Sequence, residues 1–214
     1  MGAAPDALRD LKLRIARYYG AKITRHGPTP MGVDWSCAPT QQLRFVQLLR
    51  ICEFATPLRL NDIGCGYGAL LELIARRHRS ARVDYLGIDL SEEMVVAARR
   101  LWRGRRSTAF HVGADIPRCA DYSVASGIFN VRIHEPLPLW EDFIADTLRQ
   151  MAQTSARGFA VNFLAPLPVG VEGKPELYRT APVPWIEFCA REIGGQVEVL
   201  DAYGMREFTL LVRT

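Results

Sequence analysis

The sequence lacks an apolar run long enough to cross a membrane, although 49% of its 214 residues are hydrophobic. A membrane-spanning helix needs about 20 consecutive apolar residues, and charged residues interrupt every such stretch here. The first 20 residues are also broken by charges, so they do not predict the apolar core of a signal peptide. We therefore expect a cytoplasmic protein without a membrane partner, long enough for one domain and a small lid.

Metal-binding spacing is missing as well. The chain has five cysteines, which form no CxxC pair and no cluster with histidine. An odd, scattered set of thiols is typical of reduced cysteines in the cytosol rather than of disulfides. We therefore predict no metal site. The cysteines are Cys37, Cys52, Cys65, Cys119 and Cys189.

Lysine is scarce, so the net charge of +4 comes from arginine. Arginines cluster in residues 76–82 and 99–106, and such runs can attract phosphate groups. Each run follows a predicted helix, however, where cations complement the negative end of the helix dipole. We favour solvated helix ends and expect no nucleic-acid partner.

Repeats and low-complexity tracts are also absent. Apolar residues at helical spacing predict helices over residues 5–19 and 41–54. The intervening residues 20–40 contain the sequence GPTP at 27–30, which cannot continue a helix. We expect residues 1–54 to form an N-terminal helical lid on a domain of residues 55–214.

Strands and helices alternate from residue 58 onward. Strands are predicted over 58–63, 83–88, 107–112, 122–127 and 158–164, and helices over 69–78, 92–102, 139–154 and 184–193. This alternation predicts a parallel sheet with helices on both faces. Two final strands, 197–203 and 208–212, are joined by too few residues for a parallel crossover. The predicted fold is therefore a doubly wound α/β sheet of seven strands, mostly parallel, with an antiparallel last strand.

A glycine-rich turn, DIGCGYGA at residues 62–69, joins the first strand to the following helix. Glycines in such a turn bring backbone N–H groups close to a ligand. The pattern also fits the G-x-G-x-x-A form of the dinucleotide fingerprint. An enzyme that uses a nicotinamide cofactor is therefore one interpretation of this turn.

Three acids near strand ends separate the interpretations. Asp89 ends the second strand, where its carboxylate can accept hydrogen bonds from ribose hydroxyls of either cofactor. Asp62 precedes the glycines and is placed to orient a cationic amino group. Asp115 follows the third strand and is placed to accept a bond from an adenine amino group. Ligands of open α/β sheets bind outside the carboxyl ends of the strands. Asp62 and Asp115 favour S-adenosylmethionine over NAD.

With these residues the chain resembles the class I S-adenosylmethionine-dependent methyltransferases, over roughly residues 58–130 and the C-terminal hairpin. The resemblance implies that the glycine turn surrounds the methionine part of the cofactor, that Asp89 holds the ribose and that Asp115 contacts the adenine. The antiparallel last strand is a hallmark of that family. Segments 18–20, 32–35, 125–130 and 203–213 resemble a bacterial subgroup without an assigned substrate.

The N-terminal segment offers further cofactor contacts. Tyr19 and Trp35 are hypothesised to cover the sulfonium by cation–π contact, although packing is the alternative for both. Arg44 is hypothesised to pair with the cofactor carboxylate, with a surface salt bridge as the alternative. The predicted cofactor-binding residues are Tyr19, Trp35, Arg44, Asp62, Gly64, Cys65, Gly66, Gly68, Asp89, Leu90, Met94, Ala114, Asp115, Ile116, Ser126 and Gly127.

Methyl transfer needs mainly alignment of the acceptor and exclusion of water, so the sequence carries no fixed catalytic motif. Asn130, which follows the fourth strand, and two histidines that could act as bases are the catalytic candidates. The family's signature for methylation of adenine or glutamine nitrogen is absent at residues 126–130. The catalytic candidates are His26, His134 and Asn130. The substrate candidates are Phe129, Glu135 and Tyr178, with Arg179 beside the last of them.

The favoured hypothesis is methyl transfer from S-adenosylmethionine to an oxygen or nitrogen of a small-molecule acceptor. The alternatives are a methyltransferase acting on RNA or protein, an NAD-dependent oxidoreductase, and a non-catalytic partner of another subunit. The arginine runs motivate the RNA or protein alternative, but no nucleic-acid-binding module accompanies them. The oligomeric state stays open between monomer and homodimer.

Overall fold

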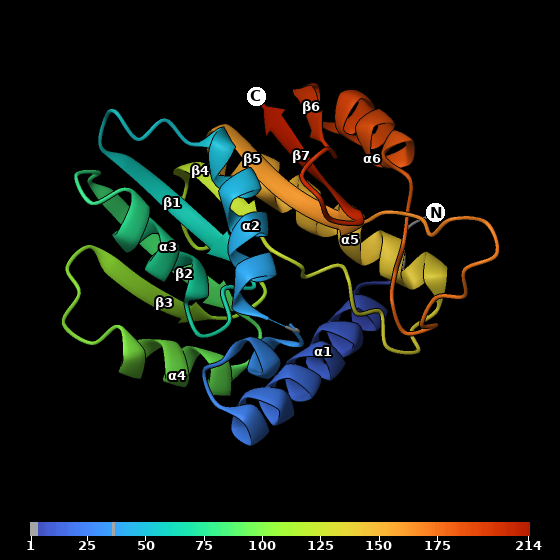
Figure 1. Cartoon of the computed structure of the whole chain (residues 1–214), viewed down its shortest axis with the longest axis horizontal. Helices are drawn as coiled ribbons and strands as arrows, with labels where there is room; N and C mark the ends of the chain where they lie inside the picture. Colours follow the sequence, from blue (N-terminus) through green and yellow to red (C-terminus); the bar gives the residue numbers. More distant parts are fainter. Residues whose placement is uncertain (1–3, 36) are drawn as a thin grey trace.

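Seven strands form one sheet in the order β3-β2-β1-β4-β5-β7-β6 (Figure 1). The computed structural model describes residues 4–35 and 37–214. The strands are β1 (Leu58–Ile63), β2 (Val83–Asp89), β3 (Thr108–Val112), β4 (Ala120–Ala125), β5 (Ser155–Leu164), β6 (Gln196–Leu200) and β7 (Glu207–Arg213). β7 runs antiparallel to both of its neighbours, and the other neighbouring pairs are parallel. The predicted fold class is confirmed.

The chain order reverses between β1 and β4. β2 and β3 lie on one side of β1, whereas β4 and β5 lie on the other side. At such a switch point the connections leave the carboxyl ends of adjacent strands in opposite directions, which leaves a crevice for ligands. The sheet therefore places its functional edge where β1, β2 and β4 end.

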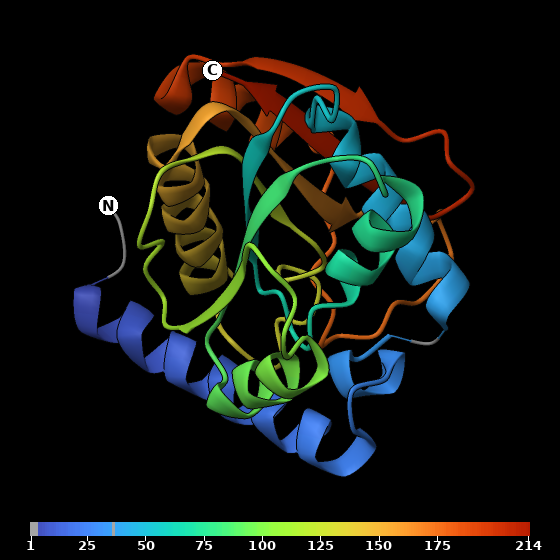
Figure 2. The same cartoon turned by 90° about the vertical axis from the view of Figure 1, so that its left-hand side faces the viewer.

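Helices cover both faces of the sheet. The helices are α1 (Pro5–His26), α2 (Ala38–Leu48), α3 (Ala69–Arg77), α4 (Glu92–Leu101), α5 (Leu137–Gln153) and α6 (Pro182–Phe188). Buried side chains of α2, α3 and α4 form one apolar core with the sheet, and those of α1, α5 and α6 contribute to a second. α1 crosses below the ends of the strands (Figures 1 and 2). No helix in the described part of the chain has both the length and the apolar character of a membrane span.

Short turns complete the helices. A 3₁₀ turn, η1 (Pro30–Val33), precedes α2, and another, η2 (Leu49–Ile51), follows it. A π turn, η3 (Cys189–Ile193), extends α6. The second predicted helix therefore ends at Ile51 rather than at residue 54.

The first helix is longer than its sequence predicts. α1 runs through Gly20 to His26, whereas the sequence predicted an irregular segment from residue 20. Gly20 is buried against α4, and a Cβ atom at this position would lie 2.6 Å from Oε2 of Glu93. The close approach of the two helices thus offsets the low helix propensity of glycine. The helix ends at His26. Gly27 follows with a φ of 66°, and the next residue is a proline.

Candidate active site

The glycine turn between β1 and α3 adopts a conformation that requires glycine. Gly64, Gly66 and Gly68 have φ values of 68°, 54° and 82°, in the left-handed region that other residues avoid. The amides of Gly64 and Cys65 donate to the carbonyl of Ile88 at 2.8 and 3.1 Å, which ties the turn to the end of β2. The turn is therefore a fixed wall of the functional edge.

Asp89, the last residue of β2, joins the glycine turn to the start of α4. One carboxylate oxygen accepts from the amide of Gly66 at 2.8 Å, and the other accepts from the amide of Ser91 at 2.9 Å. Removal of the carboxylate from water raises the pKa of Asp89 to about 6, although these amides favour the charged form. A ligand with hydroxyl donors would stabilise the ionised form further.

Asp62 lies at the end of β1 and is only 2% exposed. The Tyr85 hydroxyl donates to its Oδ2 at 2.6 Å. Burial raises the pKa of Asp62 to about 7, the Tyr85 bond opposes this rise, and nearby Asp89 adds to it. Asp62 therefore titrates near neutral pH, and a cationic ligand beside it would favour its charged form.

These groups line a cavity of about 270 Å³ at the edge of the sheet. Residues of α1, α2, the glycine turn, the strand ends and the segment after β5 surround it. The cavity brings together most of the predicted cofactor residues and Asn130. Those that line it are Tyr19, Trp35, Arg44, Asp62, Gly64, Cys65, Gly66, Asp89, Leu90, Met94, Ala114, Ile116, Ser126, Gly127 and Asn130.

Two predicted cofactor residues lie outside this lining. Gly68 caps the start of α3, and a Cβ there would lie 2.5 Å from Nε1 of Trp102, so packing explains this glycine. Asp115 is exposed, whereas its neighbours Ala114 and Ile116 line the cavity. The structure therefore gives neither residue a direct contact with the cavity.

The two histidines proposed as bases are also outside the lining. His26 is the last residue of α1, and His134 is exposed in the turn before α5. Nothing in the described lining places an imidazole near the cavity. The sequence could not distinguish these histidines, because their position depends on how the N-terminal helix and the turn fold back.

The three predicted substrate residues lie outside the described lining of the cavity and contact other parts of the fold. Phe129 is buried and stacks on Phe163, with ring centroids 5.3 Å apart. Tyr178 belongs to the second core, and its hydroxyl donates to Oε1 of the exposed Glu141 at 3.2 Å. The adjacent Arg179 does line the cavity.

Glu135, the third candidate, is held by an arginine of the N-terminal helix. Nη2 of Arg14 donates to its Oε2 at 2.8 Å, and Nε of Arg14 donates to the other oxygen. Both carboxylate oxygens therefore have partners, and Glu135 fastens the turn before α5 to α1.

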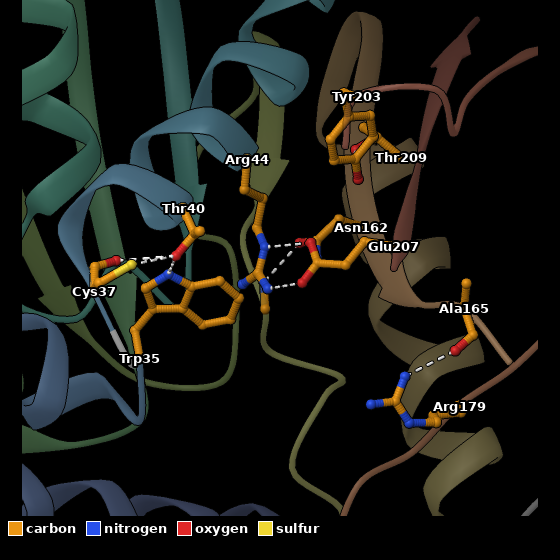
Figure 3. A network of polar contacts seen from close by, with 11 residues as sticks. Trp35, Cys37, Thr40, Arg44, Asn162, Ala165, Arg179, Tyr203, Glu207 and Thr209 are labelled. Carbon is orange, nitrogen blue, oxygen red and sulfur yellow. Dashed lines mark hydrogen bonds and ion pairs between the residues drawn. The ribbon is translucent and has the colours of Figure 1, made fainter. Parts of the chain in front are cut away.

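A buried network surrounds Arg44, and no local sequence pattern predicts it (Figure 3). The Arg44 Nε donates to Oε2 of Glu207 at 2.9 Å, and its Nη2 donates to Oε1. Asn162 donates to Glu207 at 3.2 Å and accepts from the amide of Gly127 at 2.8 Å. The Arg44 guanidinium also lies 3.7 Å from the ring centroid of Trp35. Arg44 was predicted to pair with a cofactor carboxylate or to form a surface salt bridge; the structure shows a buried pair with Glu207.

Two polar atoms near the cavity have no hydrogen-bond partner. They are the carboxamide oxygen of Asn130, in a residue that is 5% exposed, and Nε of Arg179. Buried polar atoms are nearly always paired in native proteins, so these two are exceptions among the described residues. No group of three or more metal-ligating side chains stands together among the described residues.

The fold and the cavity define a class: Rossmann-like proteins that hold a ligand between a glycine turn and the acids of neighbouring strand ends. A family model described as a methyltransferase domain matches residues 61–137. The Mycobacterium tuberculosis protein named "Putative methyltransferase Rv1506c" is 42% identical over 165 residues, which cover 77% of this chain and 98% of that protein.

A second curated protein matches over a shorter stretch, and a solved structure shares the fold. A trans-aconitate 2-methyltransferase of Pseudomonas paraeruginosa is 41% identical over 64 residues, covering 30% of this chain and 22% of that enzyme. The structure also resembles the magnesium protoporphyrin IX methyltransferase of Synechocystis with bound S-adenosylmethionine. The TM-score is 0.57 at 18% identity, over 82% of this chain and 79% of that one. The chain belongs to the class I S-adenosylmethionine-dependent methyltransferases.

Proposed function

We propose that the protein transfers a methyl group from S-adenosylmethionine to an oxygen or nitrogen of a small-molecule acceptor. The observation that carries the proposal is the placement of two desolvated carboxylates, Asp62 and Asp89, on either side of a rigid glycine turn in one cavity. The cofactor has a cationic amino group and a ribose diol, which are the partners these carboxylates need.

In this proposal the cofactor lies across the ends of the first three strands. Asp89 accepts from the ribose hydroxyls, and Asp62 faces the amino group of the methionine part. Ala114 and Ile116, which follow β3, form the walls of the adenine site. Asp115 is exposed beside them, so we propose that it contacts only the outer edge of the adenine.

The residues of the turn fit such a ligand. At Gly66 a Cβ atom would lie 2.9 Å from Cγ1 of Val33, so only glycine leaves the turn and the N-terminal segment this close. Tyr19 and Trp35 also line the cavity, where their rings can lie near a sulfonium. When bound, the cofactor supplies an activated methyl group with a neutral leaving group, and the protein supplies alignment and exclusion of water.

Two segments support an acceptor of modest size. α1 closes one side of the cavity through Lys12, Ile15 and Ala16, and the segment after β5 closes another through Leu177 and Arg179. The names of the trans-aconitate and magnesium protoporphyrin relatives give small molecules as their acceptors. The lid was predicted over residues 1–54; we propose this role for α1 alone, because Phe45 and Leu48 of α2 belong to the first core.

Asn130 is the residue we propose for orienting the acceptor. It lines the cavity after β4, and its carboxamide oxygen is buried without a partner. No histidine belongs to the described lining, so neither His26 nor His134 is retained as a base. The acceptor atom then attacks either as an already ionised oxygen or as an amine that loses its proton to water.

The arginine runs do not favour a nucleic-acid substrate. Arg76 lies in the last turn of α3 and donates to Gln42 at 2.7 Å. Arg99 lies in the last turn of α4 and donates to the carbonyl of Phe110 at 2.7 Å. Both runs thus lie at helix ends, where cations complement the helix dipole, and one arginine of each contacts the chain itself, which supports the small-molecule proposal.

Calorimetry with S-adenosylmethionine, S-adenosylhomocysteine and NAD tests the cofactor. We expect binding of the first two and none of NAD. Asp89→Ala should weaken binding by roughly 100-fold or more, because charge-assisted hydrogen bonds to the ribose are lost. The exposed Asp201→Ala provides a control of the same charge change. An unchanged affinity of Asp89→Ala would refute the role of Asp89.

A labelled-methyl screen over metabolite pools then identifies the acceptor.

A further inference from the structure

We propose that Arg179 is an anion-binding residue for a carboxylate of the acceptor, an inference that rests on the proposed function. Three cationic side chains line the cavity: Lys12, Arg44 and Arg179. Lys12 pairs with Asp146 at 2.9 Å, and Arg44 pairs with Glu207. Arg179 forms no ion pair with any carboxylate of the described chain, so its charge is available to a ligand.

The orientation of the Arg179 guanidinium is fixed by one of its nitrogens. Nη1 donates to the carbonyl of Ala165 at 2.9 Å, whereas Nε is buried and has no partner (Figure 3). The Nε and Nη2 groups form the edge of a guanidinium that accommodates both oxygens of a carboxylate. Arg14 and Arg44 bind Glu135 and Glu207 in this molecule through that same pair of nitrogens.

The backbone holds Arg179 at the ends of β4 and β5. The amide of Tyr178 donates to the carbonyl of Asn130 at 2.9 Å, and the amide of Thr180 donates to the carbonyl of Leu164 at 3.1 Å. These two hydrogen bonds fix the backbone on either side of Arg179, whose side chain lines the cavity. A site on a fixed backbone loses little conformational entropy when a ligand binds.

This position separates Arg179 from the proposed cofactor site. The cofactor is assigned to the ends of β1, β2 and β3, and the order of the sheet places β4 and β5 on the opposite side of β1. Asn130, with its unpartnered carboxamide oxygen, lies next to Arg179 through the hydrogen bond to Tyr178. Together they define a polar end of the acceptor site, in which Arg179 binds the carboxylate and Asn130 a neighbouring polar group.

The test compares acids with amides of the same shape. Benzoate with benzamide, and succinate with succinamide, are titrated into the protein saturated with S-adenosylhomocysteine. We expect at least one acid to bind roughly 10- to 100-fold more tightly than its amide, as is typical of charge-assisted hydrogen bonds. Arg179→Gln should abolish that preference, Arg179→Lys should retain part of it, and the exposed Arg103→Gln should leave it unchanged.

The contrary outcomes are distinct. The proposal is overturned if no acid is preferred over its amide, or if Arg179→Gln keeps the preference. It is also overturned if Arg179→Gln weakens S-adenosylmethionine binding as much as acid binding, since Arg179 would then hold the cofactor carboxylate. If the wild-type protein binds neither S-adenosylmethionine nor S-adenosylhomocysteine in the calorimetry described above, the proposed function itself fails. A loss of the acid preference with cofactor binding intact overturns only the role of Arg179.

Discussion

The buried carboxylate of Asp62 lowers the stability of the folded protein at high pH, and we propose that it binds the cofactor. Its pKa is about 7 in the folded protein and 3.8 in its ordinary state, so the folded chain holds more protons between these pH values. Stability rises with pH only where the unfolded state binds more protons. The contribution of Asp62 to stability is therefore full at low pH and falls as the pH rises from about 4 to about 7.

Asp62→Asn should consequently stabilise the protein without ligand at pH 8 and weaken cofactor binding. Asparagine is neutral, and its carboxamide oxygen can still accept from Tyr85. We expect a gain on the order of 1–3 kcal/mol at pH 8 and almost none at pH 4. Thermal unfolding at both pH values, with calorimetry of S-adenosylmethionine binding, measures the two effects. A loss of stability at pH 8 would contradict the assigned cost of this charge. Asp89 keeps its own raised pKa, so the pH slope becomes shallower rather than flat.

Single residues also show where prediction from the sequence ends. The glycine turn, Asp62 and Asp89 were predicted because a strand, a turn and an acid are local patterns. Phe129 and Tyr178 were predicted to meet the substrate, and both lie in the second core. An aromatic residue near a strand end can face either the core or the cavity, and only the packing of α5 and α6 decides. Arg179, one residue from Tyr178, is the one that lines the cavity.

At the scale of elements, a buried ion pair joins α2 to β7. Arg44 and Glu207 are each about 3% exposed, and 163 positions separate them in the sequence. No periodicity or motif links residues so far apart, so the sequence could not predict the pair. α2 is thereby fixed to the last strand as well as to the core, which holds Trp35 and Arg44 over the cavity.

Glu207→Gln should destabilise the protein by about 3 kcal/mol, because it leaves a buried guanidinium without its counter-charge. Urea unfolding of the variant measures this loss. Glu198→Gln is the matched control, since Glu198 is half exposed and pairs with Arg50 on the surface. Exposed pairs contribute at most about 1 kcal/mol. If the two variants lose similar stability, the Arg44–Glu207 pair does not fasten α2 to the sheet.

The sequence predicted only the first part of α1, because the remainder depends on a contact with another helix. Periodicity identified α1, but the preference of glycine for irregular backbone suggested a break at Gly20. Gly20 packs closely against Glu93 of α4, and a local sequence pattern carries no information about such a contact between two helices. The stop at Gly27 and Pro28 was visible because both signals are local.

At the scale of the whole molecule, the topology determines where ligands meet. The reversal of strand order beside β1 opens one edge, and the acids, the glycine turn and Asn130 all lie there. Alternating strands and helices, with one short final link, were enough to predict this arrangement. The closure of the edge was harder to predict, because it depends on α1 crossing below the strands (Figure 2).

Hydrogen exchange tests whether that closing segment responds to ligand. α1 lines the cavity through Lys12, Ile15, Ala16 and Tyr19, whereas no described residue after Arg179 does. With S-adenosylhomocysteine at 100 times its Kd, amides that exchange only when the cavity opens should slow by about 100-fold. We expect this protection in α1 and the glycine turn, and none in α6 or β6. Asp89→Ala at the same ligand concentration should lose it throughout. Protection confined to residues 62–94 would mean that α1 is a fixed wall of the site and not a lid.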